Sequence, residues 1–213
     1  MDGGELTETV YLIDDEPRVL KALMRLLKSY GYVTKSFLSA QDFLAAYDPS
    51  TPGCILLDLQ LPGMDGLELQ KVLLDRGSIH PITFLSGHGD IPTSVAAMKK
   101  GAVDFLTKPI DTKALISSVE AALERNRKDR ASATQRDEVQ HRCGTLSQRQ
   151  RQVVDGVVGG LLNKQIAARL GITEKTVKVH RARAMSKLGC RSAVEMVRVI
   201  NGAPEALTPN ERA

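Results

Sequence analysis

Residues 55–68 read ILLDLQLPGMDGLE, and this stretch predicts the fold of the first half of the chain. The apolar run Cys54–Leu57 ends on Asp58, and the turn-forming pair Pro62-Gly63 leads to Asp65, a residue suited to begin a helix. A short apolar run bounded in this way is typical of a strand buried on both faces of a parallel sheet. Asp58 then lies at the carboxyl end of that strand, where open α/β sheets bind their ligands. Considered alone, Asp58 fits a carboxylate that caps a loop equally well.

The composition of the 213 residues is that of an ordinary globular protein. Hydrophobic residues make up 42% and charged residues 25% of the chain, and the length allows one or two domains. No apolar segment approaches the roughly 20 residues of a membrane-spanning helix, and no signal-peptide pattern opens the chain. We therefore expect a cytoplasmic protein that does not contact a membrane. Three widely spaced cysteines argue against a disulfide framework, and His141 and Cys143 lack a second ligand pair at zinc-like spacing.

The net charge of +4 is distributed unevenly along the chain. Residues 1–124 contain 11 Lys and Arg against 17 Asp and Glu, whereas residues 145–213 contain 12 against 5. The intervening residues 125–144 contain 6 against 3. Such an asymmetry indicates two domains, of which the basic one contacts a polyanion. A solvated basic surface is the alternative interpretation, because charge alone does not identify a partner.

Strand-like and helix-like segments alternate five times before residue 124. Strands are predicted over residues 9–13, 32–37, 54–57, 81–85 and 103–106. The helices that follow them begin near Pro17, Ser39, Asp65, Ile91 and Asp111. The first of these helices has an apolar stripe of Leu20, Leu23, Leu27 and Tyr30. The alternation predicts an α/β fold with a doubly wound, five-stranded parallel sheet.

The predicted strand ends bring acidic and cationic side chains to one edge of this sheet. Asp14 and Asp15 follow the first strand, Asp58 ends the third, Ser86 follows the fourth and Lys108 follows the fifth. Three close carboxylates repel one another unless a divalent cation lies among them, and an all-oxygen site suits Mg²⁺. The ammonium of Lys108 and the hydroxyl of Ser86 can donate hydrogen bonds to phosphoryl oxygens. The cluster therefore predicts a magnesium site in which Asp58 attacks phosphorus and forms an aspartyl phosphate.

These residues stand at the spacing found in response-regulator receiver domains, and residues 8–124 resemble that family throughout. The resemblance implies a flavodoxin-like fold and a phosphoacceptor role for Asp58. It also implies a switch role for the Ser86 hydroxyl and a phosphoryl-binding role for Lys108.

The same resemblance implies how the metal and the phosphoryl group are handled. Asp15, Asp58 and the backbone carbonyl of Gln60 would bind Mg²⁺ directly, and Asp14 would act through a water molecule. Gln60 and His88 would flank the path of the attacking water, so we expect them to tune dephosphorylation rather than phosphorylation.

Phe105 occupies the position of the aromatic switch, where the family more often has Tyr. Without a hydroxyl, its inward movement would be driven by packing alone. The resemblance also implies a cis bond between Lys108 and Pro109. We expect phosphorylation to promote formation of a homodimer through the helix that begins near Ile91 and the strand that holds Phe105.

From Thr145 onward the sequence predicts short helices only. Their starts are marked by capping residues: Ser147 with Gln150, Asn163, Thr173, and Ser192 with Glu195. The second and third of these helices are joined by residues 171–173, which makes them a helix-turn-helix in a small all-α domain.

The third of these short helices exposes a face that fits the major groove of DNA. Its residues on that face are Lys175, Lys178, Val179 and Ala182. Three further residues are placed to contact phosphates: Lys164, Thr176 and Arg183. Basic helical bundles also bind proteins, so the pattern favours DNA without establishing it.

Residues 145–200 resemble a LuxR-type helix-turn-helix, through NKQIA at 163–167 and TVKVH at 176–180. With the receiver-like segment, the chain is similar to the NarL/FixJ class of two-component response regulators. The sequence SGHGDIP at 86–92 makes it most similar to the FixJ branch. Gln150 departs from the LuxR pattern, which usually has Glu there. Gln can still complete a capping box but cannot form the ion pair of a glutamate.

The resemblance implies a transcriptional regulator whose Asp58 is phosphorylated by a sensor histidine kinase. Its partners would be promoter DNA, a second copy of the chain after phosphorylation, and RNA polymerase. Its only chemistry would be self-phosphorylation from a phosphodonor and autodephosphorylation, so it would not be a conventional enzyme. Two other hypotheses are a phosphorelay sink, which would leave no promoter footprint, and a constitutive DNA binder, which would not take up phosphate.

The expected organisation has four parts. Residues 1–124 form the receiver domain, 125–144 a linker, 145–202 the DNA-binding domain and 203–213 a disordered tail. The linker either extends the last receiver helix or forms a flexible tether, and both interpretations fit its polar composition.

Overall fold

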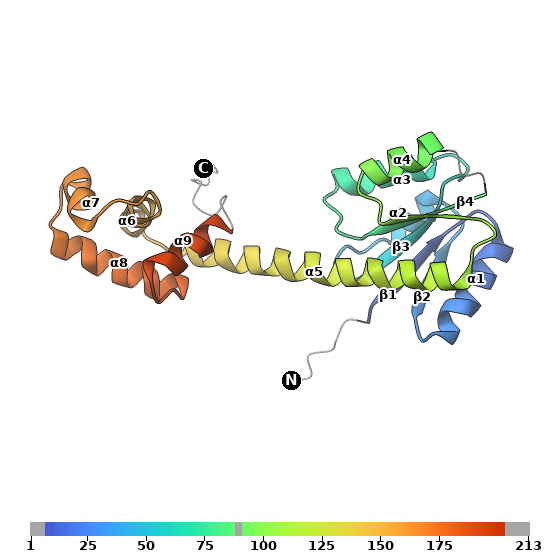
Figure 1. The fold of residues 1–213 in the computed structure, drawn as a ribbon, viewed down its shortest axis with the longest axis horizontal. Coiled ribbons are helices and arrows are strands. Elements are labelled where there is room, and N and C mark those ends of the chain that lie inside the picture. Colours follow the sequence, from blue (N-terminus) through green and yellow to red (C-terminus); the bar gives the residue numbers. More distant parts are fainter. Residues whose placement is uncertain (1–6, 88–90, 203–213) are drawn as a thin grey trace. The chain divides into compact units, whose positions relative to one another are not determined.

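The computed structural model describes residues 7–87 and 91–202 and divides the chain into two compact units. The first unit ends at Arg130 and the second begins at Ala131. Figure 1 shows a layered α/β unit that contains the strands and a second unit made of helices. Within the described ranges, no helix combines the length and the apolar character that crossing a membrane requires.

The first unit contains a five-stranded parallel sheet in the order β2-β1-β3-β4-β5. The three central strands are buried along their whole length, whereas β2 lies at an edge and exposes part of its surface. The predicted doubly wound sheet is confirmed. Its strands are β1 (Thr9–Ile13), β2 (Val33–Phe37), β3 (Gly53–Asp58), β4 (Ile82–Ser86) and β5 (Asp104–Thr107).

Helices cover both faces of this sheet, and alternate strand residues pack against different helices. Tyr11 and Phe84 belong to the core beneath α2, α3 and α4, whereas Leu12 and Leu56 belong to the core beneath α1 and α5. A shift of one residue along a strand would exchange the two sets, so the apolar pattern sets the register. The helices are α1 (Pro17–Ser29), α2 (Ala40–Ala46), α3 (Gly66–Asp75), α4 (Ile91–Lys99) and α5 (Thr112–Gly144).

The apolar stripe of α1 is shorter than predicted. Leu20, Leu23 and Leu27 are buried, but the predicted fourth member, Tyr30, is wrong, because its side chain is 55% exposed. Tyr30 follows the last helical residue, and Gly31 adopts a φ of 87°, which reverses the chain toward β2. The helical period therefore no longer places the Tyr30 ring over the core.

The long helix α5 includes the segment that the sequence left open between a helix and a tether. Asp111 begins the helix, as predicted, because its carboxylate accepts a hydrogen bond of 2.9 Å from the Ala114 N–H. The helix then continues without interruption to Gly144, so residues 125–144 are helical. The boundary between the two units lies within α5.

Side chains of α5 bind the backbone at the amino ends of the strands. Asn126 is fully buried; its Oδ1 accepts from the Gly53 N–H at 3.0 Å, and its Nδ2 donates to the Ile79 carbonyl at 2.9 Å. Arg130 Nε donates to the same Oδ1 at 3.2 Å, and Arg130 Nη2 donates to the Pro49 carbonyl at 2.7 Å. These bonds attach α5 to the first unit as far as Arg130.

Replacing Asn126 by Ala should lower the free energy of unfolding by about 1–3 kcal/mol, because the buried Gly53 N–H would lose its acceptor. Urea unfolding of the full chain, followed by circular dichroism, measures this. The control is Arg127→Ala, which removes a largely exposed ion pair of 2.7 Å with Glu8 and should cost less than about 1 kcal/mol. Equal losses from the two substitutions would contradict this assignment.

The second unit has one core, to which the end of α5 and the four following helices all contribute. The close approach of α6 and α7 depends on Gly156, because a Cβ at this position would lie 2.8 Å from Ile166 Cγ1. The short helices are α6 (Gln148–Val158), α7 (Asn163–Leu170), α8 (Glu174–Leu188) and α9 (Ala193–Asn201).

The predicted helix starts in this unit are correct in part. Ser147 and Gln150 form the predicted capping box, with bonds of 3.3 and 2.9 Å. The predicted cap at Asn163 is wrong, because Asn163 is the first helical residue and Leu162 occupies the cap position. The Asn163 side chain instead accepts a hydrogen bond of 3.1 Å from Arg181 Nη1 on α8.

The cap at Thr173 is confirmed, since its hydroxyl accepts from the Thr176 N–H at 3.2 Å. At Ser192 only half of the predicted capping box forms. The Ser192 hydroxyl accepts from the Glu195 N–H at 3.1 Å, but the Glu195 carboxylate accepts from the Arg191 N–H. The predicted disordered tail, residues 203–213, lies outside the described residues.

Candidate functional site

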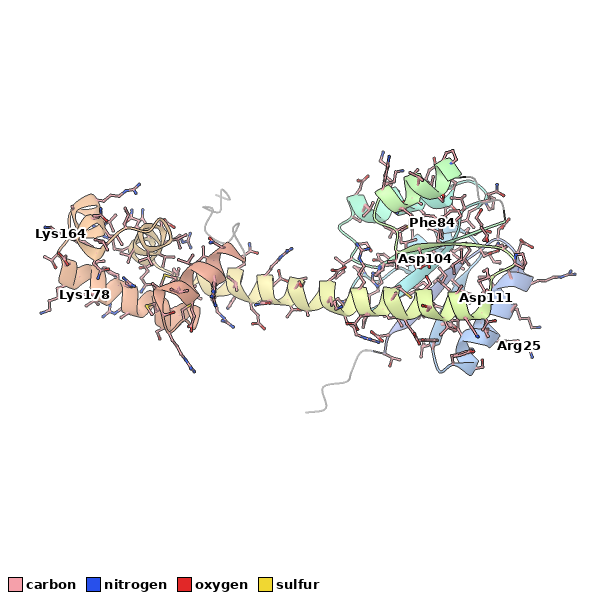
Figure 2. The ribbon with its side chains drawn as sticks, in the orientation of Figure 1. Arg25, Phe84, Asp104, Asp111, Lys164 and Lys178 are labelled. Atoms are coloured by element: carbon pink, nitrogen blue, oxygen red, sulfur yellow. The ribbon has the colours of Figure 1, made fainter. Side chains whose placement is uncertain are left out.

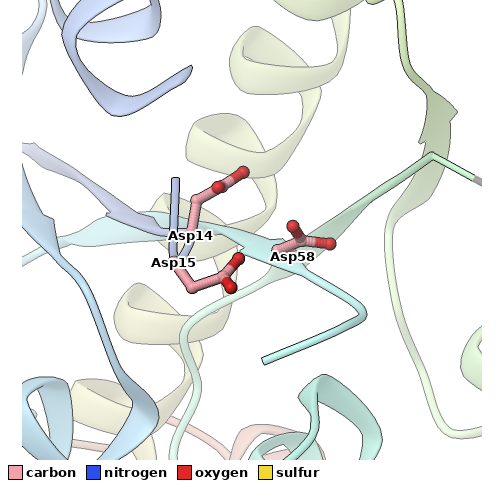
Figure 3. Close-up of side chains that lie close together, drawn as sticks. All are labelled: Asp14, Asp15 and Asp58. Carbon is pink, nitrogen blue, oxygen red and sulfur yellow. The ribbon is translucent and has the colours of Figure 1, made fainter. Parts of the chain in front are cut away.

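The carboxyl edge of the parallel sheet collects the predicted polar side chains. Asp14 and Asp15 directly follow β1, Asp58 is the last residue of β3, Ser86 is the last residue of β4, and Lys108 directly follows β5. Figure 3 shows the carboxylates of Asp14, Asp15 and Asp58 close together above the strands. The parallel sheet therefore brings together residues that are up to 94 positions apart in the sequence.

The three carboxylates form a site that fits a divalent cation. Each offers one oxygen, and these oxygens lie within 4.8 Å of one another. Asp14 and Asp58 are buried, whereas Asp15 is exposed and leaves one side of the cluster open to water. A set of hard oxygen donors with access to water is the arrangement that Mg²⁺ prefers. Gln60 is exposed, and its backbone N–H donates to Asp58 Oδ1 at 3.1 Å.

The ammonium of Lys108 partly compensates the negative charge of the two buried carboxylates. Its Nζ lies 2.7 Å from Asp14 Oδ2 and 2.7 Å from Asp58 Oδ2. Burial lowers the pKa of the Lys108 ammonium, but the hydrogen bonds to Asp14 and Asp58 outweigh this effect and raise the pKa above its ordinary value. Burial raises the pKa of Asp14, and the hydrogen bond from Lys108 opposes that rise only partly.

Two neighbours of this cluster were not predicted as site residues. Glu16 Oε1 lies 3.9 Å from Lys108 Nζ, and the acidic run at 14–16 was the signal for it. Gly66, at the start of α3, packs directly against Asp58, since a Cβ there would lie 2.5 Å from the Asp58 carbonyl oxygen. Its only sequence signal is its position after the helix cap Asp65, so the close approach becomes visible only in the structure.

Of the two predicted switch residues, Ser86 ends β4, which neighbours β3, and Phe105 lies within β5. Ser86 is buried, and its carbonyl accepts a hydrogen bond of 2.7 Å from the Lys108 N–H, which ties the ends of β4 and β5 together. Phe105 is half-buried, with its ring centroid 6.4 Å from that of Phe84. The Lys108–Pro109 bond is cis, as the resemblance implied. His88 lies outside the described residues.

In the second unit, α7 and α8 form the predicted helix-turn-helix. Gly171, with a φ of 62°, ends α7, and Thr173 begins α8 two residues later. The buried face of α8 consists of Val177, Ala184 and Leu188, as predicted.

The opposite face of α8 is exposed and basic. Lys164 on α7 is also exposed, and Figure 2 labels it together with Lys178 at the surface of this unit. Thr176 is half-buried, and its hydroxyl shares a hydrogen bond of 2.9 Å with Thr173. Within the described part of the chain, none of the lysines or arginines predicted to contact DNA forms an ion pair. The exposed residues of the α8 face are Lys175, Lys178, Val179, Ala182 and Arg183.

Two protein families match the two units. Residues 10–120 match the response regulator receiver domain, and residues 144–200 match the bacterial regulatory proteins of the luxR family. The response regulator protein TodT of Pseudomonas putida is 42% identical over 204 residues, covering 96% of this chain and 90% of TodT. The transcriptional regulatory protein FixJ of Azorhizobium caulinodans is 45% identical over 190 residues, covering 89% of this chain and 90% of that FixJ.

Solved structures give the same result. The response regulator StyR matches with a TM-score of 0.81 at 40% identity, covering 92% of this chain and 98% of StyR. Full-length FixJ from B. japonicum matches with a TM-score of 0.57 at 38% identity, covering 92% of this chain and 97% of that chain. The chain thus belongs to the NarL/FixJ class of two-component response regulators, DNA-binding transcriptional regulators that join a receiver domain to a LuxR-type helix-turn-helix domain.

Proposed function

We propose that Asp58 is the residue that accepts a phosphoryl group from a sensor histidine kinase. The observation that carries this assignment is the position of the Asp58 carboxylate, at the end of a central strand and 2.7 Å from the Lys108 ammonium. A P–O bond to Asp58 forms as the P–N bond of the kinase phosphohistidine breaks, and the electron pair returns to the imidazole. No other substrate is turned over, so the receiver acts only on its own phosphorylation and dephosphorylation.

The residues around Asp58 hold the phosphoryl group as charge develops on it. Asp14, Asp15, Asp58 and the Gln60 carbonyl would hold Mg²⁺, which supplies charge compensation when bound. Lys108 moves from the carboxylates to a phosphoryl oxygen, because that oxygen becomes its strongest anionic partner. The hydroxyl of Ser86 donates to a second phosphoryl oxygen.

Gln60 and His88 set the lifetime of the aspartyl phosphate. Gln60 and His88 each stand two positions beyond a pocket residue, Asp58 and Ser86 respectively. In the receiver family these two positions flank the path of the attacking water, so the resemblance predicts that they change the rate of hydrolysis rather than the uptake of phosphate.

Phosphorylation changes the surface formed by α4 and β5. When Ser86 turns toward the phosphoryl oxygens it vacates space, which Phe105 fills by moving inward. The surface affected contains Ala96, Lys99, Lys100 and Asp104, and the lysines and the aspartate of two copies pair across a two-fold axis. The exposure of Lys99 and Lys100 supports this assignment.

Dimerisation brings two DNA-binding domains to one promoter. Each domain binds a half-site, and the half-sites lie about one helical turn apart. Tethering raises affinity through effective concentration without new base contacts. The regulator acts in the cytoplasm and controls transcription by contact with RNA polymerase.

Asp58→Asn should abolish phosphorylation by acetyl phosphate or by the kinase and leave the fold intact, because the amide is not a nucleophile toward phosphorus. Mass spectrometry of intact protein in the presence of Mg²⁺ measures the added phosphoryl group. The control is Asp75→Asn, an exposed carboxylate on α3, which should be labelled like the parent. Full labelling of the Asp58 variant would refute the assignment.

Mg²⁺ should raise the free energy of unfolding of the parent protein, by about 1.4 kcal/mol for each tenfold increase in concentration above the dissociation constant. Asp15→Asn should remove most of this increase without changing stability in EDTA, because Asp15 is exposed and has no bond to Lys108. Urea unfolding with and without Mg²⁺ measures both effects, with Asp75→Asn as the control. An unchanged Mg²⁺ response in the Asp15 variant would exclude it as a ligand.

Lys178→Ala should cost about 1–3 kcal/mol on the preferred DNA site and relax its sequence choice, because the residue lies mid-helix on the exposed face of α8. Lys164→Ala should weaken binding to all sequences alike and reduce its dependence on salt, as expected for a phosphate contact. Fluorescence anisotropy with specific and scrambled duplexes at several salt concentrations separates the two. The same loss of specificity in both variants would contradict the division of roles.

At a protein concentration of about tens of micromolar, the phosphorylated protein should sediment as a dimer and the unphosphorylated protein as a monomer. Lys99→Glu should prevent dimerisation by placing like charges across the interface, whereas Lys113→Glu, an exposed lysine on α5, should not. Analytical ultracentrifugation after treatment with a phosphodonor measures this. Normal dimerisation of the Lys99 variant would exclude this surface.

A further inference from the structure

A buried histidine joins the two loops that α5 holds in the first unit. His80 lies in the loop before β4 and is only 5% exposed. Its Nε2 lies 2.7 Å from the carbonyl oxygen of Thr51, in the loop before β3, and its Nδ1 lies 2.7 Å from the Tyr47 hydroxyl. The Tyr47 hydroxyl also lies 2.5 Å from the Ser78 hydroxyl. These groups form a continuous chain of hydrogen bonds from one loop to the other.

The contacts of His80 determine which of its ring nitrogens carries the hydrogen. A carbonyl oxygen only accepts, so Nε2 donates to Thr51, and Nδ1 of the neutral ring accepts from Tyr47. The Ser78 hydroxyl then donates to Tyr47 and accepts from the His80 N–H at 3.2 Å. A second proton, on Nδ1, would force the Tyr47 and Ser78 hydroxyls to turn, and the Ser78 hydroxyl would need a new acceptor. The network therefore fits the neutral ring and disfavours the imidazolium.

The charges near the ring also disfavour a proton on it. Burial lowers the pKa of His80, and the hydrogen bond to the Thr51 carbonyl opposes this effect only partly. The positive charge of Arg130 lowers the pKa further, and it outweighs the negative charge of Asp48, which acts in the opposite direction. His80 is thus held neutral by its burial and by a cation of α5.

The titratable groups that face His80 in the described part of the chain keep their charge state at mildly acidic pH. The Tyr11 ring on β1 packs edge-on against the His80 ring, with the centroids 5.9 Å apart. Burial raises the pKa of Tyr11 and of Tyr47, so both stay neutral. Hydrogen bonds from Ser50 lower the pKa of Asp48, so this carboxylate stays ionised. A change of charge in this region on mild acidification therefore falls on His80.

Arg130 connects this network to α5. Its Nη2 donates to the Pro49 carbonyl at 2.7 Å, in the same loop as the Thr51 carbonyl that His80 holds. Asn126, one turn earlier in α5, binds the backbone directly after that loop and within the loop of His80. A positive charge on His80 would repel the Arg130 guanidinium and disturb the hydrogen bonds between the loops at the same time.

We propose that a proton on His80 weakens the attachment of α5 to the first unit, which makes this attachment sensitive to acid. In the opened loops the ring is hydrated and regains the ordinary histidine pKa of about 6.5. Because the packed structure binds this proton more weakly than the opened one, opening becomes easier as the pH falls below about 6.5 and is unaffected well above it. The boundary between the two units directly follows Arg130, so the effect falls on the part of α5 that joins them.

Hydrogen exchange of the full chain at about pH 7.5 and about pH 5.5, corrected for the intrinsic effect of pH on amide exchange, tests the proposal. Exchange in residues 48–53 and 124–130 should be about threefold to tenfold faster at the lower pH, since a fall of about one pH unit below the ordinary histidine pKa favours the protonated, opened form by up to tenfold. Exchange in α7, in the other unit, should not change and serves as the reference. Equal exchange at the two pH values would overturn the proposal.

Variants separate His80 from other titrating groups. His80→Gln keeps a donor for the Thr51 carbonyl but does not titrate, so the acceleration should disappear. His141→Gln changes an exposed histidine of α5 outside the network and should keep the acceleration. Tyr47→Phe removes the donor to Nδ1 of the neutral ring, so it should raise the pKa of His80 and move the acceleration to higher pH. Acceleration that persists in His80→Gln would assign the effect to another group and overturn the proposal.

The coupling of His80 to α5 is measured by proton NMR of the His80 ring, whose signal is identified by its loss in His80→Gln. Arg130→Gln should raise the pKa of His80, because it removes the neighbouring positive charge and retains a donor for the Pro49 carbonyl. Arg25→Gln, which changes an exposed arginine on α1, should leave the pKa of His80 as in the parent. The same pKa of His80 in the parent and in Arg130→Gln would overturn the link to α5.

Discussion

The hydrogen bonds from Lys108 to the buried carboxylates of Asp14 and Asp58 are the constraint on which the receiver unit depends. Two buried carboxylates without a nearby cation would cost on the order of several kcal/mol, and the Lys108 ammonium offsets part of this cost by reaching both. That ammonium arrives from the end of β5, which the Lys108 N–H ties to β4 through the Ser86 carbonyl. Under the proposed function, the groups that stabilise the resting site are the same groups that would rearrange on phosphorylation of Asp58.

At the amino ends of the same strands, the polar contacts hold a helix in place and do not form a reactive site. Asn126 and Arg130 bind backbone groups before β3 and β4, so the first turns of the α5 extension belong to the receiver unit. Beyond Arg130 the helix contributes Val139 and Cys143 to the core of the second unit. One helix thus contributes residues to both compact units.

The second unit shows how short helices are made stable and still present a binding face. Thr173 caps α8 and three of its residues are buried in the core, which leaves Lys178 and Val179 exposed on the opposite face. Residues 145–213 carry a net charge opposite in sign to that of residues 1–124, because they contain 12 basic residues and 5 acidic ones. This separation of charge suits a protein whose two halves bind partners of different chemistry.

The sequence by itself determined the sheet, because strand burial follows directly from continuous apolar runs, and it determined the cluster of Asp14, Asp58 and Lys108, because parallel strands end at one edge. It did not determine contacts made between distant parts of the chain. The attachment of α5 to the first unit around Asn126 depends on bonds to Gly53 and Ile79, and the role of Asn163 depends on Arg181, which lies 18 positions away. Tyr30 continues an apolar period but lies outside the helix, and Gly66 has no side chain whose pattern could reveal its packing against Asp58. Periodicity indicates which face of an element is buried. The partner of a polar side chain, or the close neighbour of a glycine, is decided only when the elements pack together.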